Sequence, residues 1–361
     1  MVASLVSNPI NIISHKGEYV VSFIKNNIKE LNSEFTNDNF YIVDKNIATI
    51  YGDQLNNILN SDKVILIEAT EVNKSLDKFP AYVDSLVEAK VRRGQNLVAI
   101  GGGIIQDITC FLASTMMRGL PWIFYPTTLL AQSDSCIGSK SSINSGDIKN
   151  ILGTFTPPNK VIIDVNFIKT LKEKDILSGI GEMIKVHAID SPQRFDQLAK
   201  NYDHVKDDLL LMEKFIHQSL VMKKKLIEID EFDIGPRNVM NYGHSFGHAI
   251  ETATGYAIPH GIAVTIGMDI ANYVASKLGV SRNQHFERMH SLLDKNCKSY
   301  RKVRIDVRSL ILALAKDKKN SATQLRLILP DLDGKITIGL YDNNEKLFNI
   351  IKEYFSIYGA K

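Results

Sequence analysis

Five short apolar runs in the first half of the chain, separated by stretches with helical spacing, constrain the fold most. The runs lie at residues 40–43, 64–67, 96–100, 122–125 and 161–163, and each has the length of a buried strand. Strands that alternate with helical patterns form parallel sheets, because the chain must cross over between neighbouring strands. The first half is therefore predicted to be an α/β domain with a parallel sheet.

The pattern changes near residue 175, where long helical stretches begin to follow one another. They cover residues 175–189, 205–229, 238–255, 261–278 and 283–295. A β-rich patch interrupts them at residues 325–329, with a second run at 335–338. We predict two domains, an α/β domain over residues 1–170 and a mainly α-helical domain over residues 171–361. Because pockets favour domain interfaces, the active site is expected in the cleft between them.

Composition excludes several classes of protein and partner. The 361 residues carry 43 basic and 40 acidic side chains, a net charge of +3, which gives no basis for binding nucleic acid or a membrane surface. No run of about 18 apolar residues occurs, so we expect no membrane span. The three cysteines, Cys110, Cys136 and Cys297, are too few and too scattered for a disulfide framework or a thiolate metal site. With no signal-peptide pattern at the N-terminus, a cytoplasmic protein is predicted.

A run of three glycines marks a candidate nucleotide site. Gly101, Gly102 and Gly103 stand between a predicted strand and a predicted helix, where backbone amides can approach a pyrophosphate. The run is not the common G-x-G-x-x-G fingerprint, because its last position is Gln106, and a tight turn would explain the glycines equally well. Asp44 ends an earlier strand and can bind a ribose or simply cap a helix.

Histidines in the second half indicate a candidate metal site. His244 and His248 are one helical turn apart, so both imidazoles can face one cation. His260 and the upstream carboxylate Glu182 add two further ligands, whereas a catalytic zinc takes about three and keeps one position open. Ser245 stands where the HExxH proteases have their general base, which excludes that class. Glycine beside each histidine indicates that something approaches the backbone closely.

Basic side chains suggest a phosphate or carboxylate site. Lys140 and Lys149 lie in a loop-rich stretch, and each lysine suits a phosphate but is also an ordinary surface residue. Arg237 offers a planar fork that suits a carboxylate. Lys185 lies three residues after Glu182 and so on the same helix face.

These segments resemble those of 3-dehydroquinate synthase and related sugar phosphate cyclases over nearly the whole chain. The matching segments are residues 71–75, 126–135, 149–150, 181–185, 230–231 and 241–251, followed by His260-Gly261. The segment Asn241-Tyr242-Gly243-His244-Ser245-Phe246-Gly247-His248 is the most specific of them. The resemblance implies a Rossmann-like sheet, a helical second domain and a lyase of the shikimate pathway that acts on a sugar phosphate.

The resemblance also implies roles for individual residues. Glu182, His244 and His260 would hold Zn²⁺, or Co²⁺ in its place, and His248 would serve the substrate instead of pairing with His244 on the metal. NAD would contact Asp44, Glu71, Lys74, Gly102, Gly103, Asp107, Thr127, Thr128, Lys140 and Lys149. The substrate would lie among Asp134, Lys140, Asn150, Lys185, Lys223, Arg237, Asn241 and His248. Arg118 matches an arginine that relatives lend to a neighbouring subunit, which implies a homodimer.

The implied reaction uses NAD without net redox change. Transient oxidation of a substrate carbon acidifies the neighbouring C–H bond, phosphate is eliminated, the hydride returns, and an intramolecular aldol step closes a carbocycle. Lys223 and Arg237 would grip a substrate carboxylate, as in 3-deoxy-D-arabino-heptulosonate 7-phosphate. Gln106 and Ser139 depart from the glycines usual in the family, and Ser141-Ser142 from a Thr-Gly-like pair, which leaves a variant substrate open.

Three other interpretations are weighed against this one. A cyclase of the 2-deoxy-scyllo-inosose or 2-epi-5-epi-valiolone synthase kind would act on a sugar phosphate without a carboxylate and tends to lose the arginine that matches Arg237. A metal-dependent polyol or glycerol-phosphate dehydrogenase shares the architecture but lacks the full lysine and arginine set. A non-enzymatic scaffold is a third possibility, against which the intact set Glu182, His244 and His260 argues.

Overall fold

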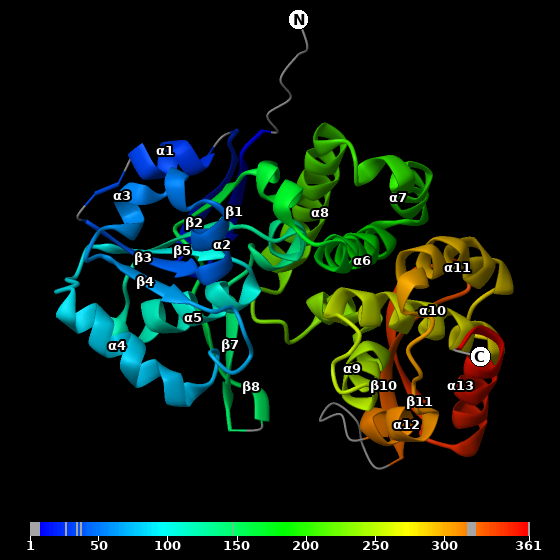
Figure 1. The fold of residues 1–361 in the computed structure, drawn as a ribbon. Helices are drawn as coiled ribbons and strands as arrows, with labels where there is room; N and C mark the ends of the chain where they lie inside the picture. The colour runs from blue at the N-terminus through cyan, green and yellow to red at the C-terminus, as the bar shows by residue number, and fades with distance from the viewer. Residues whose placement is uncertain are drawn as a thin grey trace, which may run out of the picture. The chain divides into compact units, whose positions relative to one another are not determined.

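The computed structural model describes residues 8–25, 27–33, 35–36, 38–146, 148–315 and 323–359. Its contacts divide the chain into two compact units (Figure 1). Unit 1 comprises Met1–Leu171 and Leu209–Asp233, and unit 2 comprises Lys172–Asp208 and Ile234–Lys361. The helix α8 (Leu209–Ile229) thus packs with unit 1, although it follows the first boundary in sequence. The assignment of NAD binding to residues 1–170 and of metal binding to residues 171–361 stays a prediction.

Among the described residues, unit 1 is built on a seven-stranded sheet with the strand order β1-β2-β9-β6-β5-β3-β4. The strands are β1 (Ile10–Ser14), β2 (Gly17–Phe23), β3 (Asn39–Asp44), β4 (Val64–Ile67), β5 (Asn96–Gly101), β6 (Trp122–Pro126) and β9 (Lys160–Ile163). Only β1 and β2 pair antiparallel within this sheet. The five predicted strands and their parallel pairing are confirmed, and the antiparallel hairpin at the edge was not predicted.

Helices lie around this sheet in Figure 1, and α2 to α5 connect parallel strands of the sheet as expected. They are α1 (Asn27–Ser33), α2 (Lys45–Ile50), α3 (Asn56–Leu59), α4 (Phe79–Glu88) and α5 (Gly103–Thr115), together with α8. A core under one part of the sheet packs Tyr41 and Val43 against Leu55 and Ile58. Because β3, β5 and β6 are parallel, their carboxyl ends share one edge of the sheet, the usual position of ligand sites in such folds.

A separate hairpin of β7 (Lys140–Ser145) and β8 (Ile148–Phe155) carries several predicted site residues. The hairpin is antiparallel, and Ser75 forms an isolated parallel bridge to Asn144 of β7. β8 is exposed along nearly its whole length. The hairpin therefore brings the 71–75 segment and residue 150 into one neighbourhood of unit 1.

Unit 2 is mainly helical, as predicted, and α10 (His260–Leu278) is its central helix. Every residue of α10 from Gly261 to Ala275 is buried, because α6, α9, α11 and α13 pack around it. The other helices are α6 (Glu173–Asp190), α7 (Pro192–Val205), α9 (His244–Ala253), α11 (Asn283–Cys297), α12 (Val307–Ala315) and α13 (Glu345–Tyr358). The predicted β-rich patches form the antiparallel pair β10 (Gln324–Pro330) and β11 (Ile336–Asp342).

Two predicted helices of the second half differ in their bounds. The stretch 205–229 contains the end of α7 and the whole of α8, with residues 206–208 between them. The stretch 238–255 contains the end of a 3₁₀ turn, η6 (Pro236–Asn241), and then α9. Gly243 separates the two at φ 78°, a conformation that glycine adopts without the usual steric cost. None of the described helices is long and apolar enough to cross a membrane.

A buried carboxylate fixes the C-terminal helix in unit 2. Asp269 of α10 is fully buried, and its Oδ2 accepts a hydrogen bond of 2.7 Å from the Tyr354 hydroxyl of α13. His290 Nδ1 lies 2.9 Å from the same oxygen, and Arg301 Nη2 lies 3.6 Å from it. The hydrogen bond to Asp269 raises the pKa of His290 despite its partial burial. Protonated His290 therefore ties α11 to α10.

We expect this pair to make stability depend on pH. Because the pKa of His290 is higher in the native state, its protonated form stabilises the fold. This contribution to the free energy of unfolding is complete below the unfolded pKa of about 6.5 and is lost as pH rises through the native pKa. The free energy of unfolding of metal-free protein, measured by urea titration, should therefore fall over that window. His290→Phe should flatten the dependence, whereas His204→Asn, at an exposed site, should leave it unchanged. An identical slope in wild type and His290→Phe would contradict this assignment.

Candidate active site and metal centre

The glycine run forms the turn between β5 and α5. A Cβ on Gly101 would lie 2.6 Å from the Ile105 side chain, and one on Gly102 would lie 2.8 Å from Thr128 Cγ2. Gly102 precedes the first residue of α5, Gly103, so the helix begins directly at the carboxyl edge of the sheet. This is the geometry in which free amides of a helix N-terminus face an anion. The turn thus fits the predicted nucleotide site, and phosphate binding by it stays a prediction.

Gln106 has a structural role that the sequence did not reveal. Its side chain is buried, donates a 2.7 Å hydrogen bond to the Ser135 carbonyl and accepts one of 2.6 Å from the Ser135 hydroxyl. Ser135 ends η4 (Ala131–Ser135), a π-helical turn of a kind frequent at functional sites. The departure from glycine at this position therefore ties α5 to the turn that carries Asp134.

Asp44 and the two threonines have local partners in the structure. Asp44 ends β3 and accepts a hydrogen bond from the Asn46 amide, so it caps α2, and burial raises its pKa. Thr127 is buried, with its amide bonded to the Gly101 carbonyl. Thr128 Oγ1 accepts from the Ala131 amide. The capping alternative for Asp44 is thus observed, and NAD contacts by these three residues stay predictions.

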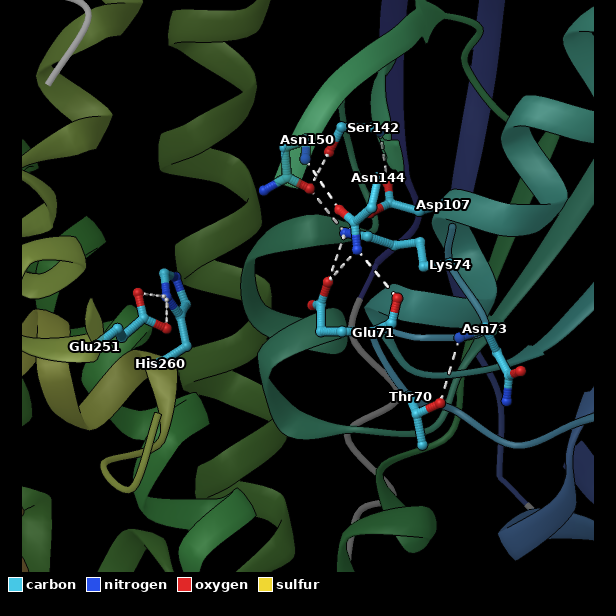
Figure 2. Close-up of polar contacts among 10 residues, drawn as sticks. All are labelled: Thr70, Glu71, Asn73, Lys74, Asp107, Ser142, Asn144, Asn150, Glu251 and His260. Atoms are coloured by element: carbon cyan, nitrogen blue, oxygen red, sulfur yellow. Dashed lines mark hydrogen bonds and ion pairs between the residues drawn. The ribbon is translucent and has the colours of Figure 1, made fainter. Parts of the chain in front are cut away.

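Lys74 is the centre of a polar network in unit 1 (Figure 2). Its Nζ lies 3.0 Å from Asp107 Oδ2 and 2.9 Å from Asn150 Oδ1. Burial raises the pKa of Asp107, and the neighbouring Lys74 opposes that rise. Asn144 donates to Glu71 Oε2 at 2.8 Å, and its own Oδ1 accepts from the Asn150 amide. The structure therefore brings Glu71, Lys74, Asp107 and Asn150 together, and it adds Asn144, which sequence reasoning missed.

Two further lysines of unit 1 are paired with carboxylates. Lys223 of α8 is buried and lies 2.7 Å from Asp134 Oδ1, and it also donates 2.6 Å to the Asp134 carbonyl. Lys140 is exposed and lies 3.0 Å from Asp233 Oδ2. Lys149 is exposed on β8. Asp134 and Lys223, 89 residues apart in sequence, are thus neighbours, and substrate binding by them stays a prediction.

In unit 2, Glu182, His244 and His260 converge. One ligand atom from each lies within 4.8 Å of the others. The Nε2 atoms of His244 and His260 are 3.8 and 3.4 Å from Glu182 Oε1, while Lys185 Nζ is 2.5 Å from Glu182 Oε2. Two imidazoles and one carboxylate are a ligand set that zinc uses in catalytic sites. These residues therefore fit a divalent cation.

Glycines allow this convergence, because they let the three helices touch backbone to backbone. A Cβ on Gly181 of α6 would overlap the Gly261 carbonyl, and one on Gly261 of α10 would overlap the Ser178 carbonyl. A Cβ on Gly243 would lie 2.6 Å from the Val264 carbonyl oxygen of α10. The glycines beside the histidines thus serve helix packing. The close approach that the sequence indicated is made by the neighbouring helices.

The two histidine ligands differ in their electrostatics. Burial, with the nearby Lys185 charge, holds the pKa of His244 well below its usual value, so this imidazole stays neutral. Burial acts in the same direction on His260, but the hydrogen bond with Glu251 and the charge of Glu182 outweigh it and raise its pKa. A metal requires neutral imidazoles, so protons compete for His260 more than for His244.

The remaining predicted site residues differ in how far they are exposed to solvent. His248 is exposed, with its ring centroid 5.4 Å from that of His244 and 5.8 Å from that of His260. Arg237 is buried in η6, and Asn241, which ends η6, donates to the Asn238 carbonyl. Arg118 is exposed and ends the turn η3 (Met116–Arg118) that follows α5, with φ 67°. Whether it reaches a second subunit stays a prediction.

Comparison with known proteins first defines the class of fold. A 2-deoxy-scyllo-inosose synthase, solved with carbaglucose-6-phosphate, NAD⁺ and Co²⁺, superposes with a TM-score of 0.79 at 20% identity over 96% of this chain and all of its own. The 2-epi-5-epi-valiolone synthase of Streptomyces hygroscopicus subsp. jinggangensis 5008, solved with NAD⁺ and Zn²⁺, also gives 0.79, at 22% identity over 94% and 96% of the two chains. The predicted fold class is thereby confirmed.

Sequence comparison then gives the family. Residues 64–178 match the 3-dehydroquinate synthase N-terminal family, and residues 179–320 match the C-terminal one. The 3-dehydroquinate synthase of Dictyoglomus turgidum is 38% identical over 335 residues, which cover 90% of this chain and 91% of that protein. The chain belongs to the 3-dehydroquinate synthase family.

The glycine contacts generate a test of the site. Gly261→Ala places a Cβ on the Ser178 carbonyl, so α10 must move away from α6, at a cost of about 1–3 kcal/mol or more. We expect a lower midpoint in urea and weaker zinc binding by calorimetry. The matched change Gly52→Ala meets no atom within 4 Å and should alter neither. Unchanged stability and zinc affinity in Gly261→Ala would contradict the packing argument.

Proposed function

We propose that this chain is an NAD- and divalent-metal-dependent 3-dehydroquinate synthase that converts a carboxylated sugar phosphate into a carbocycle with release of phosphate. The observation that carries the proposal is the convergence of Glu182, His244 and His260 in a chain of this family. Fold relatives that were solved with NAD⁺ and with Co²⁺ or Zn²⁺ support both cofactors.

Metal binding falls to the three converging residues of unit 2, and NAD binding to the glycine turn with Asp44 and the Lys74 network of unit 1. When bound, the metal would polarise a substrate hydroxyl, and NAD would accept and return a hydride. Glu182 would supply the negative charge of the metal site, and Lys185 Nζ lies 2.5 Å from its Oε2. His244 supplies an imidazole that burial keeps neutral.

The substrate is proposed to bind through positive and amide groups. Lys140 and Lys223 would bind the phosphate and the carboxylate through their ammonium groups. In the structure each forms an ion pair with an aspartate, and a bound dianion would share the lysine with that aspartate or replace it. Arg237 presents a planar fork from a buried position, which favours a carboxylate over a hydroxyl. His248, exposed beside the metal-binding imidazoles, can accept or donate a proton at the phosphate that leaves.

The overall reaction gives a direct test. Purified protein supplied with NAD, Zn²⁺ and 3-deoxy-D-arabino-heptulosonate 7-phosphate should release inorganic phosphate without accumulating NADH. Chelation should abolish release, and added Zn²⁺ or Co²⁺ should restore it, because the ligand set fits either ion. No phosphate release with both cofactors present would contradict the proposal, and net NADH formation from an alcohol would indicate a polyol dehydrogenase instead.

Substrate choice is tested at Arg237. We expect Arg237→Ala to weaken productive binding of the carboxylated substrate by about 1.5–3 kcal/mol, roughly 10- to 150-fold in kcat/KM, because a charge-assisted pair is lost. A sugar phosphate without the carboxylate should be affected much less. The exposed Arg308→Ala serves as the control. Equal losses for both substrates would show that Arg237 does not recognise the carboxylate and would favour a cyclase for neutral sugar phosphates.

A further inference from the structure

We propose that Glu251 is a positioning residue that fixes the tautomer and orientation of His260, so that Nε2 of this imidazole is the metal-binding atom. The inference rests on the proposed function, because it concerns the metal centre suggested there. It adds a residue from α9 that neither the histidine spacing nor the ligand set itself had indicated.

Each nitrogen of the His260 ring faces a different carboxylate. Nδ1 lies 3.3 Å from both Oε1 and Oε2 of Glu251, as Figure 2 shows, whereas Nε2 lies 3.4 Å from Glu182 Oε1. Glu251 and His260 stand near the end of α9 and at the start of α10, with residues 254–259 between the helices. The side chain of Glu251 is only 13% exposed, so water competes little for its oxygens.

This arrangement determines where the imidazole proton is. With a metal on the Nε2 side, a neutral His260 carries its proton on Nδ1 and donates it to Glu251, which as an ionised carboxylate can only accept. The lone pair of Nε2 is thereby directed toward Glu182 and His244, the two other members of the set. Carboxylates in this position orient metal-binding histidines and make them more basic, and their loss typically costs 10- to 100-fold in metal affinity.

Glu251 also belongs to a second set of potential ligands, with His248 and His260, whose atoms lie within 4.8 Å of one another. A cation held there by His260 Nδ1 and Glu251 would have to displace the proton that Nδ1 donates to that carboxylate. It would also leave out His244 and the fully buried Glu182, which lie within 4.8 Å of His260 in the first set. The first set therefore binds the cation, and Glu251 orients His260 through the hydrogen bond at Nδ1.

Metal affinity and cobalt spectra test the inference without any turnover. Metal-free protein is titrated with Co²⁺ while the d–d absorption is followed, and with Zn²⁺ in competition with a chromophoric chelator. Glu251→Ala should bind both ions 10- to 100-fold more weakly with an altered Co²⁺ band. Glu251→Gln retains a carbonyl acceptor for Nδ1 and should recover most of the band and part of the affinity. Glu345→Ala and Glu345→Gln, at an exposed glutamate of α13, should match wild type.

The outcomes separate this inference from the proposed function. If wild type binds no metal, the proposed function is wrong and Glu251 has no metal ligand to position. If wild type binds metal and both Glu251 variants match it in affinity and spectrum, only the positioning role is overturned. If His248→Ala loses as much metal affinity as Glu251→Ala, the inference is also overturned, because the second set would then be the metal site. Should Glu251→Ala fail to fold, Glu251→Gln decides.

Discussion

Direct backbone contact between α6, α9 and α10 is the constraint on which the candidate metal centre depends. Glu182, His244 and His260 come from these three helices, and a carboxylate and two imidazoles can meet one ion only if the helices approach closely. Gly181 against the Gly261 carbonyl, and Gly267 against the Gly243 carbonyl, permit that approach because no Cβ intervenes. The same residues explain why α10 is buried on all sides, since close neighbours leave no face for water.

The sequence predicted the parallel sheet better than the hairpins, for a physical reason. Strands buried on both faces, such as β3 and β5, are continuous apolar runs that stand out from the surrounding sequence. β8 is exposed and mixes polar with apolar residues, so neither an apolar run nor strict alternation marks it. Its conformation is maintained by pairing with β7 and by contacts of β7 with the distant 71–75 segment, which no local pattern can reveal.

Site residues that are close in sequence could be predicted from local patterns, whereas those that are distant in sequence could not. Helical spacing placed Lys185 beside Glu182, and the structure confirms that neighbourhood at 2.5 Å. The pair Asp134–Lys223 came from the family resemblance, because 89 residues separate its members. The sequence did not reveal three residues that contact site residues, namely Gln106, Asn144 and Glu251. Each contacts its partner through the fold, and a polar residue type alone does not indicate which residue that partner is.

Buried lysines in both units are paired with carboxylates. Lys74, Lys185 and Lys223 are all buried, and each lies within 3.0 Å of a carboxylate, from Asp107, Glu182 and Asp134 respectively. Taking an ammonium out of water without a partner costs several kcal/mol, so each buried lysine depends on the carboxylate beside it. The pairs are therefore part of the packing of their own units, Lys74 and Lys223 in unit 1 and Lys185 in unit 2, and their use for an anionic ligand stays a prediction.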